Sequence, residues 1–183
     1  MERRRRPLTG ISGLVLFVCM FVPAVRGCNH EAIIPIQIPF VIPPYLLGLG
    51  FALAALRVNG GLKGPTIYLR VVLILFLVEC LIAFAEEPNF GVVLLLAPTL
   101  MLGILGFKRY SDRRIAGASI ICGIGSAIWF GLFCGDHDTL IGVWLSLFAS
   151  IGLAIGGLVW LVDPDPEDDG FDLPRATVIS SGQ

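Results

Sequence analysis

Charged side chains are scarce in this sequence of 183 residues, of which only 15% are Asp, Glu, Lys or Arg. Soluble globular domains carry about 25% of these residues, so this chain lacks the means to build an ordinary charged surface. The charges are also absent from several long blocks, and 56% of all residues are hydrophobic. A soluble core does not need uncharged blocks of about 20 residues, whereas a helix that crosses a bilayer does. The composition therefore favours an integral membrane protein.

Motifs for common enzyme and nucleic-acid chemistry are missing as well. The chain has no glycine-rich phosphate loop, no serine nucleophile elbow and no basic patch of the kind that binds nucleic acid, and it contains only two histidines. The sequence does not exclude enzymatic activity, but it favours a non-enzymatic protein. It predicts no cofactor and no nucleic-acid partner.

Six apolar segments have about the length that one helical crossing requires. They cover residues 8–25, 39–57, 66–85, 90–107, 114–134 and 140–162. The connections between them are too short for a soluble domain. We therefore predict an all-α integral membrane protein, a bundle of about six transmembrane helices with short loops, as one domain over residues 1–162. Residues 163–183 are acidic, contain prolines and have few apolar side chains, which is typical of a disordered tail.

Basic residues give the direction of the spans, because Lys and Arg favour short cytoplasmic loops. With the N-terminus inside, 12 of the 13 basic residues are cytoplasmic, and only Arg26 lies outside. The cytoplasmic set is Arg3 to Arg6, Arg57, Lys63, Arg70, Lys108, Arg109, Arg113, Arg114 and Arg175. We expect a multi-pass protein of the plasma (inner) membrane with both termini, and hence the tail, on the cytoplasmic side.

The first two spans are the least certain. Arg3 to Arg6, an apolar run and Cys28 together resemble a cleavable lipoprotein signal, although Arg26 departs from that pattern, so five spans remain an alternative to six. In the second span, prolines at 35, 39, 43 and 44 interrupt the helical hydrogen-bond ladder. We expect an extended apolar stretch over residues 33–42 and a helix that begins near Pro43.

Small residues at four-residue spacing mark the fifth and sixth spans, and such stripes allow helix backbones to approach closely in lipid. The stripes are Ser119, Gly123, Ala127, Gly131 and Gly135 in or just after the fifth span, and Gly142, Ser146, Ser150 and Ala154 in the sixth. The short connection between the two spans makes them antiparallel neighbours. We expect the stripes to pack against each other, with a homodimer interface as the alternative.

Glu79 is the one acidic residue deep within a span. An ionisable group at that depth costs several kcal/mol to insert and is a candidate functional site. One interpretation is a proton or cation path that continues toward Glu86. The other is a neutral carboxylic acid that donates a hydrogen bond to a carbonyl or hydroxyl of a neighbouring helix.

Two outer loops hold a second set of reactive side chains. Cys28, His30 and Glu31 follow the first span, and Cys134, Asp136, His137 and Asp138 follow the fifth. Three interpretations stay open: a disulfide between Cys28 and Cys134, a zinc or copper site formed by Cys28, His30, Cys134 and His137, or unconnected polar loops. No established metal-site spacing is present.

Three functions remain open. The scarcity of polar residues within the spans favours a small non-enzymatic membrane protein that acts as a scaffold or binds a partner. A proton- or cation-linked carrier centred on Glu79 and a membrane enzyme with an outer-face site are the alternatives. The expected partners are the lipid bilayer and either another protein or further copies of this chain.

Overall fold

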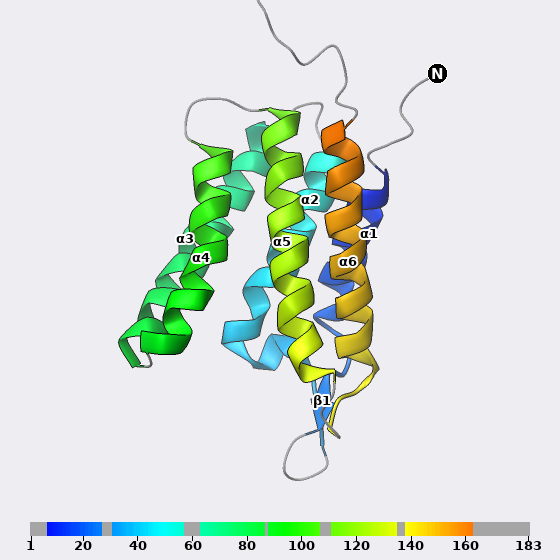
Figure 1. The fold of residues 1–183 in the computed structure, drawn as a ribbon. Helices are drawn as coiled ribbons and strands as arrows, with labels where there is room; N and C mark the ends of the chain where they lie inside the picture. Colours follow the sequence, from blue (N-terminus) through cyan, green and yellow to red (C-terminus); the bar gives the residue numbers. More distant parts are fainter. Residues whose placement is uncertain are drawn as a thin grey trace, which may run out of the picture.

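The computed structural model describes residues 7–26, 31–56, 63–86, 88–106, 111–134 and 138–162. Six α-helices account for most of these residues (Figure 1). They are α1 (Pro7–Cys19), α2 (Ile42–Leu56), α3 (Lys63–Glu86), α4 (Pro88–Leu105), α5 (Asp112–Phe133) and α6 (Ile141–Val162). Two strands of two residues each, β1 (Val25–Arg26) and β2 (Ala32–Ile33), form an antiparallel pair that the sequence did not predict.

Each predicted span overlaps one of these helices, and three of the helices are long and apolar enough to cross a membrane. These are α3, α5 and α6, whereas α1, α2 and residues Leu95–Leu105 of α4 are apolar but shorter. Helix α1 ends at Cys19 instead of continuing to Val25. Pro23 explains the early end, because the residue before a proline is sterically excluded from helical conformation.

The proline-rich segment before α2 is more compact than expected. It forms two 3-10 turns, η1 (Pro35–Gln37) and η2 (Pro39–Val41), instead of an extended stretch. Each turn has a proline at its first position, where a helical turn needs no N–H donor. The expected helix start near Pro43 is confirmed within one residue, since α2 begins at Ile42.

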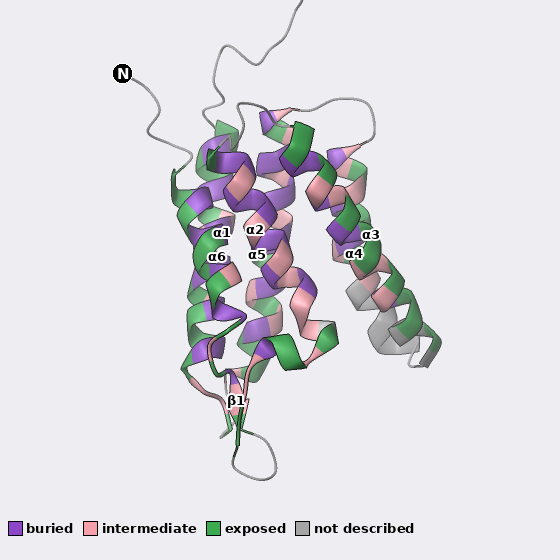
Figure 2. Ribbon diagram, turned by 180° about the vertical axis from the view of Figure 1, so that it is seen from behind, coloured by how far each residue is buried: buried purple, intermediate pink, exposed green. Residues whose placement is uncertain are grey.

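The helices form a closed ring in sequence order. Each helix packs on the next, α6 packs on α1, and α2 touches α5 across the ring. The start of α1 and the end of α6 lie at one end of the bundle, and the β-strands lie at the other (Figure 1). Toward the strand end, the α3–α4 pair leans away from the other four helices, as Figure 2 shows from behind.

Helices α5 and α6 approach to backbone contact. A Cβ atom at Gly123 of α5 would lie 2.5 Å from the backbone nitrogen of Ala154 and 2.7 Å from the carbonyl oxygen of Ser150 in α6. About one turn away along the seam, Gly157 of α6 packs on the hydroxyl of Ser119. Both contacts lie within or beside the small-residue stripes that the sequence places on these two helices.

Two residues of those stripes do not face the seam between α5 and α6. Gly131 is exposed, and no atom lies within 4 Å of where its Cβ would be. Gly142 is buried, but its neighbours are the backbone atoms of Val22 and Pro23 after α1. The four-residue repeat fails at Gly131 because an α-helix has 3.6 residues per turn, so a strict four-residue stripe winds gradually around the helix.

A second set of close contacts surrounds α1 and escaped the sequence analysis. Gly156 of α6 packs on the backbone and hydroxyl of Thr9 in α1, and a Cβ there would lie 2.7 Å from the Thr9 nitrogen. Gly13 of α1 packs against the carbonyl of Gly48 in α2. Helix α1 is therefore held between α2 and α6 by the same mechanism that joins α5 to α6.

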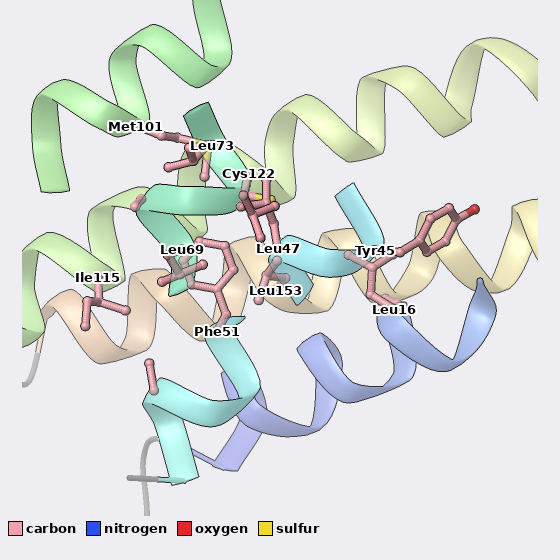
Figure 3. Close-up of a cluster of buried hydrophobic side chains, with 14 of the residues drawn as sticks. Leu16, Tyr45, Leu47, Phe51, Leu69, Leu73, Met101, Ile115, Cys122 and Leu153 are labelled. Carbon is pink, nitrogen blue, oxygen red and sulfur yellow. The ribbon is translucent and has the colours of Figure 1, made fainter. Parts of the chain in front are cut away.

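Larger side chains fill the space inside the ring. Figure 3 shows this cluster of buried side chains, which come from all six helices. Its labelled members are Leu16, Tyr45, Leu47, Phe51, Leu69, Leu73, Met101, Ile115, Cys122 and Leu153. Exposed residues are mostly Ile, Leu, Val and Phe, so the outer face of the ring is as apolar as its interior.

The contacts of Gly123 and Gly131 predict opposite effects for the same substitution. Gly123→Ala should destabilise the protein by about 1–3 kcal/mol, because the added methyl group overlaps the backbone of α6. Gly131→Ala should be neutral or slightly stabilising, because the methyl group meets open space and alanine favours a helix by up to about 1 kcal/mol. Melting temperatures of the two variants and the wild type in one detergent test this. Equal melting temperatures would contradict the proposed seam.

Candidate functional site

Glu79 lies on α3, seven residues before the end of that helix at Glu86. At 1.5 Å per residue this places it roughly 10 Å from the helix end. Its Oε2 atom is buried and has no hydrogen-bond partner in the part of the chain that the structure describes. The side chain as a whole is half-buried. A carboxyl oxygen shielded from water without a partner is costly, so Glu79 is the strongest candidate for a functional group within the helices.

The neighbouring helix α4 contains an interior proline. Pro98 lies inside α4 and has no N–H, so the carbonyl of Leu94 lacks its usual helical donor. Because α3 ends at Glu86 and α4 begins at Pro88, Leu94 and Glu79 lie at similar distances from the turn. The guanidinium of Arg70 in α3 donates to the Leu105 carbonyl of α4 at 3.2 Å, which agrees with this register. The hydrogen bond to a neighbouring helix, one of the two sequence-based interpretations of Glu79, stays a prediction.

Apolar side chains flank Glu79 on the outside of α3. Val78, Leu81 and Ile82 are each about half exposed, at 49%, 50% and 51%. Cys80, the other neighbour, is buried. Glu79 thus lies at the border between the α3–α4 contact and an open apolar face of α3.

The structure joins the segments beside the two outer loops that carry the remaining candidates. The backbone nitrogen of Arg26 donates to the carbonyl of Asp138 at 2.9 Å, and that of Leu140 donates to Ala24 at 2.8 Å. Val25 of β1 forms a β-bridge with Thr139, opposite its pairing with Ile33 of β2. Backbone hydrogen bonds therefore join residues 24–26, which precede the first of these loops, to residues 138–140, which follow the second.

The reactive side chains of these loops are only partly described. Cys28, His30, Gly135, Asp136 and His137 lie outside the described residues. Cys134 follows the end of α5 as a free thiol, and because Cys28 is not described, the disulfide between them stays a prediction. Within the described ranges no three His, Cys, Asp or Glu side chains gather as metal ligands. The suggested metal site therefore stays a prediction.

One buried polar cluster was not anticipated. The hydroxyls of Ser146 in α6 and Tyr45 in α2 lie 3.3 Å apart, and Ser146 also donates to the carbonyl of Gly142 at 2.8 Å. The ring of Tyr45 packs on Phe130 of α5, with centroids 5.6 Å apart. The side chain of Tyr45 is almost completely buried. We interpret the cluster as structural, because its hydroxyls satisfy one another and a helix carbonyl.

Comparison with known proteins gives no match, whether to protein-family models, to curated proteins or to solved structures.

The free thiol of Cys134 leads to a prediction about its reactivity. Burial raises the pKa of this thiol, so less thiolate is present near neutral pH than in an unhindered cysteine. Iodoacetamide added before any reductant should therefore modify Cys134, slowly at pH 7 and faster as the pH rises. Peptide mass mapping of the folded protein, with a short cysteine peptide as the control, measures both effects. Modification only after reduction would instead indicate the disulfide with Cys28.

Proposed function

We propose that this chain is a six-span protein of the plasma membrane with both termini in the cytoplasm. The ring supports this arrangement, because α1, α2 and α4 complete one bundle with the three helices that are long enough to cross alone. Helix α1 also contributes to the core through Leu16 and Cys19, as a retained span would. The start of α1 and the end of α6 both lie at the end of the bundle opposite the β-strands (Figure 1).

Charge supports the orientation. Lys63, Arg113 and Arg114 lie at helix ends far from the strands, whereas Arg26 lies in β1. Basic residues concentrate on the cytoplasmic side of membrane proteins. The strand end of the bundle is therefore the outer end in this proposal.

Labelling tests this topology. Single cysteines near Asn89 and Asp138, in a cysteine-free background, should react with a membrane-impermeant reagent added to intact cells. Single cysteines near Gly61 and Ser111 should react only after the membrane is opened. Labelling of Gly61 from outside would reject the proposed orientation.

We further propose that the protein is non-enzymatic and binds a partner protein within the bilayer through the α3–α4 hairpin. The observation that carries this proposal is the buried, unpartnered carboxyl oxygen of Glu79 beside an exposed apolar face. In lipid, polar side chains stabilise helix association by hydrogen bonding across the interface. The partner that fits is a transmembrane helix with a hydrogen-bond donor at the depth of Glu79. The apolar residues around Glu79 would then pack on the same helix.

Cross-linking tests the partner. A photoreactive amino acid at Val78, beside Glu79, should form a specific adduct in native membranes. The adduct should persist with Glu79→Gln, whose amide still forms hydrogen bonds, and should drop several-fold with Glu79→Leu. The same probe at Phe148, exposed on α6, is the control. Equal yields at Val78 from the wild type and Glu79→Leu would count against the proposal, and an adduct of twice the chain mass would identify a second copy as the partner.

A proton- or cation-linked carrier is the second candidate, favoured by the position of the same carboxyl group within the helices. The two functions differ in their response to one substitution. For a carrier, Glu79→Gln should abolish a pH-driven ion flux in proteoliposomes, because an amide cannot release a proton. For partner binding, no such flux should exist in the wild type.

A further inference from the structure

Basic side chains from two helices converge at the cytoplasmic end of α4. The guanidinium of Arg70 in α3 donates to the carbonyl of Leu105, the last residue of α4. The guanidinium of Arg114 in α5 lies over the next residue, Gly106, where a Cβ would be 2.6 Å from its Nη1 atom. Gly106 has a φ of 52°, which leaves its backbone open to such an approach. Two guanidinium groups, one from α3 and one from α5, thus lie at the end of α4.

Further charges surround this place. Lys63 at the start of α3 and Arg113 at the start of α5 are both exposed. The described residues at this end of the three helices include four basic side chains, Lys63, Arg70, Arg113 and Arg114, against a single acidic one, Asp112. Asp112 is only 2% exposed, so its carboxylate offers little to the surface. The end of the bundle formed by α3, α4 and α5 is therefore strongly positive.

Apolar side chains continue from these charges along the outer faces of the same helices. On α3, the face that starts with Lys63 continues with Ile67, Val71 and Ile74, all of them exposed. On α5, the face that starts with Arg113 continues with Ile124 and Ile128, which are also exposed. Residues at these spacings share one side of a helix. The surface therefore has basic side chains at the end of the bundle and exposed apolar side chains along α3 and α5. This arrangement is complementary to an anionic lipid, which has a negatively charged headgroup and apolar acyl chains.

We propose that the cytoplasmic end of α3, α4 and α5 binds the headgroup of an anionic phospholipid, whose acyl chains lie along the exposed faces of α3 and α5. Arginine forms paired hydrogen bonds with phosphate oxygens, and lysine adds a mobile charge. The long stems of these side chains allow their charged groups to reach the headgroup layer from below. Arg70 lies roughly 10 Å deeper along α3 than Lys63, so the charges span the depth of a headgroup. This inference rests on the proposed membrane insertion and orientation.

The experiment compares melting temperatures in nanodiscs of pure phosphatidylcholine and in nanodiscs that contain phosphatidylglycerol. The wild type should melt at a higher temperature in the anionic bilayer. The double variant Lys63→Gln, Arg113→Gln should lose most of this shift, because both residues are exposed and their replacement leaves the core intact. Arg26→Gln, which removes an exposed charge at the opposite end, is the matched control and should keep the shift. Native mass spectrometry should show about fivefold weaker lipid retention for each charge removed.

Each other outcome rejects a defined part of the proposal. Equal melting temperatures of the wild type in both bilayers, or an unchanged shift in the double variant, would overturn the lipid site alone. Soluble glycerol phosphate added to phosphatidylcholine nanodiscs should have no effect if the ligand is a lipid. A rise in the melting temperature under these conditions would show that the site binds a free phosphate compound, and would overturn the proposal of a lipid ligand. Failure of the wild type to enter either bilayer would overturn the proposed membrane function and this inference with it.

Discussion

The bundle depends on the close approach of α6 to its two neighbours. Helices in lipid gain little from the hydrophobic effect, since the lipid chains are as apolar as the side chains that would be buried. Dispersion contacts must replace it, and they are strongest where backbones touch. Gly123 of α5 and Gly156 of α6 provide such contacts on opposite sides of α6, one to α5 and the other to α1. The two contacts together close the ring.

Closure of the ring also brings together the residues that follow α1 and those that precede α6. Because α1 and α6 are neighbours, the chain that leaves α1 runs beside the chain that enters α6, and backbone hydrogen bonds join Pro23 to Gly142 and Arg26 to Asp138. These bonds satisfy polar groups that would otherwise remain unpaired near the end of the bundle. The β-pairing is therefore a consequence of helix packing. It joins the described residues that follow α1 to those that precede α6.

The α3–α4 hairpin is built differently from the rest of the ring. Gly103 of α4 has open space around it, and near Gly117 of α5 only a side chain of α4 comes within 4 Å. This hairpin also carries Glu79, the interior proline of α4 and, toward the end opposite the β-strands, Arg70. Helices α1, α2, α5 and α6 thus form the closely packed part of the bundle. The polar groups Glu79 and Arg70 lie on the α3–α4 hairpin, which packs less closely. Both the proposed partner site and the proposed lipid site follow from this division.

The sequence by itself determined the number of helical segments, the position of Glu79 within one of them and the distribution of basic residues, because these follow from local hydropathy and charge. It also found the small residues of α5 and α6, but only the structure separated Gly123, which touches α6, from Gly131, which touches nothing. Periodicity defines a helix face, whereas contact depends on the crossing angle and on the neighbour. The packing of α1 on α6, the hydrogen bonds that join residues 24–26 to residues 138–140 and the burial of Tyr45 were decided by the tertiary structure alone, since each depends on residues more than 100 positions apart.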